Sequence, residues 1–417
     1  MSLPIRLLGQ LGYKHLEILR GIFPHLQQQK FTRIDNFYEL FICHQTYRKM
    51  LANSSMKLLI CHQLMRRNGK KLFQSQSKKE FYFFMAMINR IYRVLNPLPN
   101  SGVLVPRLIS NHSFKQHSVS SIKFHEIYPI MAVASSSCTI WRINSDCTFE
   151  NVSSTEHSFS MEVAFHPKLP ILATGLTCGI VKLAKFNIDG TNAQIFNTTT
   201  INKGNIWSIV FHPIQPVVFV SNDYGYLMSL KFTPDFRNLL SQSLLRHHGT
   251  TINGIAIQKN GRFLSTCSDD YIVKISTFTS TDCTEIKTVT SFGSFRKILC
   301  IDIHPTLDLI AIGGDDQTAQ IWQIDENFRV TRINSLYHPS GVRCVQFDHF
   351  NLNIITGCYD GYVRIWNFEG KLIHQFKKPL SSCSSVISIG FSRNRPRIFA
   401  IGDNQEMTIS KLEELKN

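Results

Sequence analysis

One pattern recurs seven times along the C-terminal three quarters of the chain, and this fixed period constrains the fold more than any other feature. Each copy holds an alternating apolar run that ends on a large apolar residue. These anchor residues are Phe124, Phe165, Phe211, Ile257, Ile303, Phe347 and Phe391. They lie 41 to 46 residues apart, a period typical of repeated four-stranded units. We therefore expect seven such units.

The most complete copy is residues 338–368. It opens with His338 and continues with apolar residues at alternate positions, which is the period of a half-buried strand. A second strand is predicted at 353–357. A tight turn at Asp360 and Gly361 then leads to a third strand at 363–366.

The order His338, Thr356, Asp360, Trp366 resembles the WD repeat, the unit that forms one blade of a β-propeller. In that family these four side chains form a hydrogen-bond chain that ties the outer strands of a blade to the inner ones. The resemblance therefore implies a structural role for His338 and Asp360 rather than a catalytic one. Parts of the set recur as His248, Thr266 and Asp270 in the fourth copy and as Asp316 and Trp322 in the fifth.

The seventh copy, residues 385–412, supplies three strands and leaves the edge of its blade exposed. An apolar run at 102–109 lies just before the first copy. We predict that this run becomes the outer strand of the last blade, the ring-closing arrangement familiar in WD-repeat proteins. Its Pro106 is compatible with that place, because proline is tolerated on an edge strand.

The net charge of +16 is concentrated near the start of the chain. Residues 1–110 carry 17 Lys and Arg against 4 Asp and Glu, a net charge of +13, whereas residues 111–417 carry 28 against 25, a net charge of +3. A basic segment of this kind can meet a nucleic-acid backbone, an anionic membrane or an acidic protein. A biased composition produces the same excess without any such function, so both interpretations stay open.

Helical spacing of apolar residues predicts a small all-α domain over residues 1–96. The clearest helix begins at the capping box Ser77–Glu80, presents one apolar face and stops at Pro97. Residues 97–102 are rich in Pro, Asn and Gly and are predicted to be a linker. The predicted architecture is mainly β, a seven-bladed WD-repeat propeller at 103–417 preceded by this basic helical domain.

The segments 15–26 and 35–51 resemble the first and middle helices of an F-box. That resemblance implies that one apolar face meets the adaptor subunit of a cullin-type ubiquitin ligase. Its residues are Leu16, Leu19, Ile22, Phe23 and Leu26. The usual Pro beside the first Leu and the customary Trp near the last helix are absent, and unrelated helical packing would give the same spacing.

No pattern in the sequence predicts catalysis, a cofactor or a metal. Ile-Cys-His-Gln occurs at 42–45 and again at 60–63, but adjacent helical residues point about 100° apart and chelate poorly. A Gly-rich phosphate loop, GxSxG and HExxH are all missing. We therefore expect a binding module that is not an enzyme.

Partners of WD-repeat proteins usually dock on the face made by the loops into each first strand and the turns after each second strand. The resemblance places seven first-strand positions on that face: Ser120, Met161, Trp207, Asn253, Leu299, Arg343 and Ile387. We single out Trp207 and Arg343, with Asn253, because Trp and Arg are frequent anchors of interfaces. Four turn residues, Asp223, Asp269, Asp315 and Asp403, predict an acidic rim that prefers a basic or unphosphorylated peptide. Aspartate also simply suits tight turns.

Eleven scattered cysteines without a CxxC motif indicate a reducing compartment. No run approaches 18 apolar residues, so the chain is expected to be intracellular, cytoplasmic or nuclear, with mitochondrial import less favoured. Two functions remain. Either the propeller presents a substrate protein to a ubiquitin ligase recruited by the helical domain, or the chain is a scaffold in a nucleoprotein or other assembly, with its basic domain on nucleic acid or an acidic partner.

Overall fold

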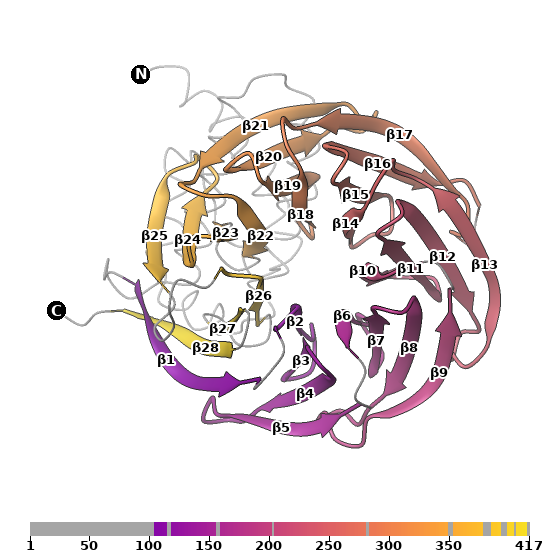
Figure 1. The fold of residues 1–417 in the computed structure, drawn as a ribbon, viewed down its shortest axis with the longest axis horizontal. Coiled ribbons are helices and arrows are strands. Elements are labelled where there is room, and N and C mark those ends of the chain that lie inside the picture. Colours follow the sequence, from indigo (N-terminus) through magenta and orange to yellow (C-terminus); the bar gives the residue numbers. More distant parts are fainter. Residues whose placement is uncertain are drawn as a thin grey trace, which may run out of the picture. The chain divides into compact units, whose positions relative to one another are not determined.

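The computed structural model describes residues 104–114, 118–155, 159–201, 204–280, 283–348, 353–377, 385–392, 398–403 and 406–414. In these segments seven four-stranded antiparallel sheets stand around a central axis as the blades of a propeller (Figure 1). The predicted mainly-β seven-bladed propeller is confirmed. The predicted helical domain at 1–96, its F-box-like face and the linker at 97–102 lie outside the described residues. None of the described segments forms a helix long and apolar enough to cross a membrane.

Each blade has a short strand at the axis and a second strand beside it that is buried on both faces. The inner strands are β2 (Ser121–Phe124), β6 (Ser160–Phe165), β10 (Ile206–Phe211), β14 (Ile252–Ile257), β18 (Ile298–Ile303), β22 (Val342–Asp348) and β26 (Ser388–Phe391). The second strands are β3 (Ile130–Ala134), β7 (Ile171–Leu176), β11 (Val217–Asn222), β15 (Leu264–Ser268), β19 (Leu309–Gly314), β23 (Asn353–Cys358) and β27 (Ile398–Gly402). The seven anchor residues all lie at or next to the ends of the inner strands.

The third strands are mostly buried, with some partly buried residues, and the outer strands are the most exposed of each blade. The third strands are β4 (Cys138–Ile143), β8 (Ile180–Lys185), β12 (Tyr226–Phe232), β16 (Ile272–Phe278), β20 (Thr318–Ile324), β24 (Tyr362–Asn367) and β28 (Glu406–Glu414). The outer strands are β5 (Phe149–Ser154), β9 (Gln194–Thr200), β13 (Leu239–Arg246), β17 (Ile286–Gly293), β21 (Val330–Tyr337), β25 (Leu372–Lys377) and β1 (Leu104–Ser113).

The apolar core lies between neighbouring blades rather than within one blade. One cluster joins Leu183 of the second blade to Val220 and Phe232 of the third, and equivalent clusters repeat around the ring. The fit is close: a Cβ on Gly357 would lie 2.5 Å from Cγ1 of Val386, which leads into the next blade. A larger residue at Gly357 would force the two blades apart.

A histidine after the inner strand holds the following turn in several blades. Nδ1 of His166 accepts hydrogen bonds from the backbone N–H groups of Lys168 at 3.1 Å and Leu169 at 2.9 Å. Burial lowers the pKa of His166 to about 4, so its ring stays neutral at pH 7 and Nδ1 can accept. The same pattern recurs at His125, His212 and His304.

Three of the four residues of the predicted chain in the sixth blade are joined by hydrogen bonds. Burial lowers the pKa of His338 to about 4, so its neutral ring donates from Nδ1 to the Leu336 carbonyl at 2.9 Å. Its Nε2 then accepts from the Thr356 hydroxyl at 2.9 Å. The same hydroxyl oxygen accepts from Nε1 of Trp366 at 3.0 Å.

Asp360 departs from the predicted chain, because its carboxylate is bound by Arg364 rather than by His338. The guanidinium donates to both carboxylate oxygens, at 2.6 and 3.3 Å, and a charged bidentate pair is stronger than a bond to a neutral imidazole. In the fourth blade Lys274 stands at the position of Arg364 and binds the His247 carbonyl instead. There the predicted arrangement forms: His248 contacts the Asp270 carboxylate at 2.9 Å and the Thr266 hydroxyl at 2.8 Å.

The ring closes through pairing of strands from the two ends of the described chain. β1 pairs antiparallel with β28 from Leu104 to Ser113, so the predicted outer strand of the last blade is confirmed and extends four residues beyond its expected end. The Asn111 side chain accepts from the Thr408 hydroxyl at 3.3 Å and donates to Glu406 at 3.4 Å. Ile109 packs on the core shared by the seventh and first blades.

Removing β1 is expected to destabilise the whole propeller, because it exposes the edge of β28 and uncovers the core beneath it. We compare the chain lacking residues 1–113 with a matched chain lacking only 1–103, which keeps β1. We expect the shorter chain to melt about 10 °C lower or more, as followed by circular dichroism. Equal melting temperatures for the two chains would contradict this role of β1.

Thr356→Val is expected to lower the free energy of unfolding by about 2–4 kcal/mol, because it leaves buried groups of His338 and Trp366 without their partner. Thr356→Ser is the matched control, since it keeps the hydroxyl and should cost about 1 kcal/mol for the lost methyl. Denaturant titration measures both. A valine variant no less stable than the serine variant would show that the hydroxyl contributes nothing.

Candidate interaction face of the propeller

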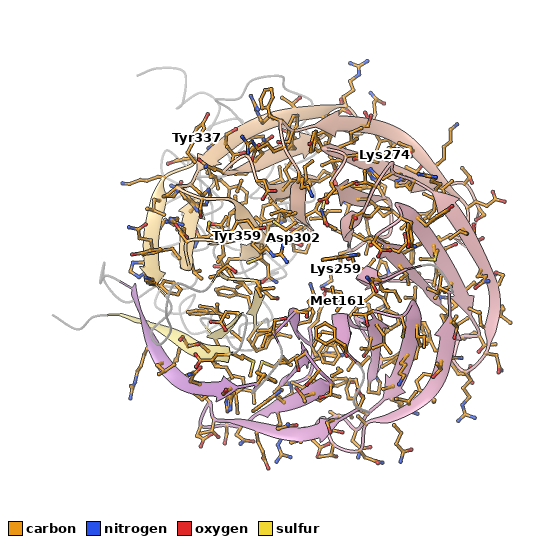
Figure 2. The ribbon with its side chains drawn as sticks, in the orientation of Figure 1. Met161, Lys259, Lys274, Asp302, Tyr337 and Tyr359 are labelled. Carbon is orange, nitrogen blue, oxygen red and sulfur yellow. The ribbon has the colours of Figure 1, made fainter. Side chains whose placement is uncertain are left out.

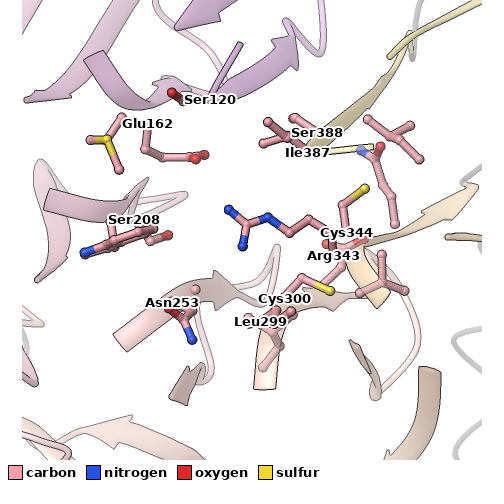
Figure 3. Close-up of a pocket in the computed structure, with 18 of the residues that line it drawn as sticks. Ser120, Glu162, Ser208, Asn253, Leu299, Cys300, Arg343, Cys344, Ile387 and Ser388 are labelled. Atoms are coloured by element: carbon pink, nitrogen blue, oxygen red, sulfur yellow. The ribbon is translucent and has the colours of Figure 1, made fainter. Parts of the chain in front are cut away.

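The seven predicted first-strand positions converge around the axis of the ring. All of them line one cavity of about 320 Å³ (Figure 3). This cavity opens on what we name the top face, formed by the loops that lead into the inner strands and the turns between second and third strands. One residue from each blade therefore contributes to a single site.

Most charged groups in the wall of the cavity are engaged with one another or with the backbone. Nζ of Lys123 lies 3.0 Å from Oε1 of Glu162, and burial raises the pKa of the Glu162 carboxyl. Asp302 accepts from the backbone N–H of Phe347 in the next blade at 2.8 Å. Ser208 similarly accepts from the N–H of Ile255 at 3.1 Å. These bonds fix the inner strands to each other.

Trp207 and Arg343 differ from this wall, the first in having an unpaired buried donor and the second in extending its guanidinium into the cavity. Nε1 of Trp207 is buried and has no hydrogen-bond partner among the described residues. The Arg343 side chain points into the cavity (Figure 3). Its guanidinium contacts Tyr359, with Nη1 3.4 Å from the phenol oxygen and the guanidinium carbon 5.9 Å from the ring centre. A ligand in the cavity could therefore bind the Arg343 guanidinium, whereas Nε1 of Trp207 is buried and closed to it.

Three of the four aspartates in the predicted acidic rim form hydrogen bonds or an ion pair within the fold. Asp223 accepts from the N–H of Asn205 at 3.1 Å. Asp269 pairs with Lys297 at 2.7 Å and also accepts from Asn253 at 2.7 Å. Asp403 is buried and accepts from the N–H of Glu406 at 2.7 Å. The turn interpretation thus accounts for three of the four carboxylates, and Asp315 is half-buried in its turn.

Asn253 serves the fold in the same way as Asp269, since its amide donates to both Asp269 and the Ile298 carbonyl at 2.9 Å. This amide links the fourth blade to the fifth. Arg343 therefore remains the predicted contact residue whose donors extend into the cavity.

Exposed aromatic side chains gather on the top face over the third to sixth blades, a feature that the sequence did not indicate. They are Tyr224, Tyr271, Phe295, Tyr337 and Tyr359. Phe295 is 89% exposed and Tyr337 77% exposed. Figure 2 shows Tyr337 towards the rim of the ring and Met161 near its central opening. The blade alignment gives their positions in the top-face turns and loops, but it does not give their exposure.

The cavity also holds thiols, but these are poor nucleophiles and poor metal ligands. Burial raises the pKa of the Cys344 thiol to about 12 and that of the Cys300 thiol well above its usual value, so both stay protonated at pH 7. Within the segments that the structure describes, no group of three or more His, Cys, Asp and Glu side chains could hold a metal ion. We therefore interpret the central cavity as a binding site.

Comparison with family models identifies three of the repeats. The model named WD domain, G-beta repeat matches residues 239–275, 285–323 and 331–367. Each match begins on an outer strand and ends on the third strand of the following blade. The matched unit therefore crosses the boundary between two structural blades.

Several characterised proteins are similar to parts of this chain. Human apoptotic protease-activating factor 1 is 25% identical over 209 residues, which is 50% of this chain and 16% of that protein. A guanine nucleotide-binding protein subunit beta-like protein of Encephalitozoon cuniculi is 27% identical over 29% of this chain and 36% of its own length. Human F-box-like/WD repeat-containing protein TBL1X is 34% identical over 21% of this chain and 18% of its own length. The chain thus spans well under half of each relative.

Proposed function

We propose that this WD-repeat β-propeller is a non-catalytic protein-interaction scaffold that binds a protein partner on its top face. The observation that carries the proposal is the set of exposed aromatic residues on this face, together with the Arg343 guanidinium that points into its central cavity. Aromatic residues and Arg supply most of the binding energy in protein interfaces. The repeat family of the blades is one whose members generally act as scaffolds.

The energetics favour a partner that offers an acceptor at the cavity mouth. The Arg343 guanidinium extends into the cavity, and a hydrogen bond from a charged donor is stronger than one between neutral groups. Arg343 comes from the sixth blade and Trp207 from the third, so the two line different sides of the cavity. Lys297 forms an ion pair with Asp269, so the rim is less acidic than the sequence suggested.

A paired substitution tests the top face. Phe295→Ala combined with Arg343→Glu should reduce capture of the specific partners by at least about tenfold, as measured by quantitative affinity mass spectrometry with the full chain. Ile127→Ala combined with Lys168→Glu is the matched control, because it makes the same kinds of change on exposed residues of the opposite face. An identical partner set for all three proteins would overturn the proposal.

We further propose that residues 1–96 form an F-box-like module that recruits the adaptor subunit of a cullin-type ubiquitin ligase. The support is the helical spacing of Leu16, Leu19, Ile22, Phe23 and Leu26, together with the similarity of this chain to an F-box-like/WD repeat-containing relative. In this scheme the propeller holds the substrate and the ligase supplies the chemistry.

Binding of the purified adaptor to the full chain should disappear when Leu19 and Phe23 are both changed to Asp, because charge on the apolar face prevents its burial. Arg20→Ala, in the same predicted helix, should leave binding unchanged. Absence of adaptor binding by the unaltered chain would contradict the ligase role. Salt-sensitive binding to nucleic acid that requires residues 1–110 would instead favour the nucleoprotein scaffold, which the net charge of +13 in that segment supports.

A further inference from the structure

Strand β13 is an outer strand of the third blade whose free edge faces outward. Its sheet runs β10-β11-β12-β13, and Figure 1 shows β13 along the outside of the ring. Residues 240–246 are all exposed, with Leu240 at 57% and Leu244 at 44%. Exposed leucines on a free edge invite pairing with another strand.

Five of the other six outer strands carry residues that normally discourage such pairing, and β9, with the sequence QIFNTTT, is the exception. Lys287 lies in β17, Arg332 in β21, Lys377 in β25 and Glu150 in β5, while β1 contains Pro106 and Arg107. Charge and proline on an edge oppose the addition of a further strand. In β13 the sequence LLSQSLLR has no charge before its last residue. This edge therefore carries no charge over seven consecutive residues, and its one irregularity is a bulge at Leu240, where the register with β12 shifts.

The same seven residues read identically in both directions. Leu-Leu-Ser-Gln-Ser-Leu-Leu, from Leu239 to Leu245, is a palindrome centred on Gln242. A two-fold axis at Gln242 would set two copies of β13 antiparallel, with the same residue types opposite each other. Leu240 would face Leu244 of the second copy, and Ser241 would face Ser243. A symmetric interface requires this kind of self-complementarity.

The backbone has the direction that this pairing needs. The N–H of His247 donates to the Gly225 carbonyl next to β12. Because successive residues of a strand point their N–H groups to opposite sides, Leu245 and Ser243 also face β12. The N–H and C=O groups of Leu244 and Gln242 consequently face outward. Gln242 would then bond to its own counterpart at the centre of the pair.

We propose that β13 pairs with β13 of a second copy of this chain, which joins two blades into one continuous eight-stranded sheet. The two-fold axis passes through Gln242. One strand pair buries less than the ~1,200 Å² of a standard interface, so the dimer forms reversibly and depends on concentration. This inference does not rest on the proposed function of the top face.

Substitutions at the two facing leucines test both the interface and its register. Leu240→Lys with Leu244→Lys sets like charges against each other across the two-fold axis and should abolish the dimer. Leu240→Glu with Leu244→Lys sets opposite charges together and should restore it. Sedimentation velocity of the full chain over a concentration series measures the dimer fraction. The Lys–Lys variant should shift the half-dimer concentration upward at least tenfold relative to the Glu–Lys variant.

Thr198→Lys, on the exposed outer strand β9, is the control for a charge added to a different edge, and it should dimerise like the unaltered chain. Circular dichroism establishes that each variant is folded, as expected for substitutions at exposed positions. A chain that remains monomeric at every concentration would overturn the proposal. So would a dimer that the Lys–Lys variant leaves unaffected, because it would place the interface elsewhere or assign β13 to another partner.

Discussion

Every blade of this propeller depends on the antiparallel pairing of β1 with β28. The blades bury their apolar faces against their neighbours, so an open ring would leave two such faces exposed at its ends. Closing the ring joins Asn111 to Glu406, 295 residues apart in the chain. Loop-closure entropy grows only with the logarithm of loop length, so one well-made strand pair can offset it. Loss of the β1–β28 pairing in the last blade would therefore destabilise every blade of the ring.

Much of the architecture follows from the sequence because each blade repeats the same register relative to its anchor. Once Phe211 and Phe347 are aligned, Trp207 and Arg343 must each lie four residues earlier on an inner strand. Inner strands of a ring converge, so these positions meet at the axis and line one cavity. The ring-closing strand was predictable for a related reason: a three-stranded seventh copy has an unfilled edge, and an apolar run stood just before the first copy.

What the sequence could not predict depends on contacts between side chains rather than on register. Asp360 was expected beside His338, but Arg364, four residues further along, binds its carboxylate more strongly. Asp269 was predicted as part of an acidic rim, but Lys297 from the following blade forms an ion pair with it. Such competition involves neighbours that no repeat alignment marks. The exposure of the aromatic residues could not be predicted for the same reason, because the loops around a turn decide whether its tyrosine is exposed.

The proposed β13 pairing and the top face have a geometric relation that limits how a dimer could act. β13 runs towards the top face, because it leads into the loop before β14. In an antiparallel pair the second copy runs the opposite way, so the two top faces point in opposite directions. Two such faces cannot engage one flat partner together, and avidity requires simultaneous engagement. The dimer would instead join two separate partners, one at each end, which is the arrangement expected of a scaffold rather than of a high-affinity clamp.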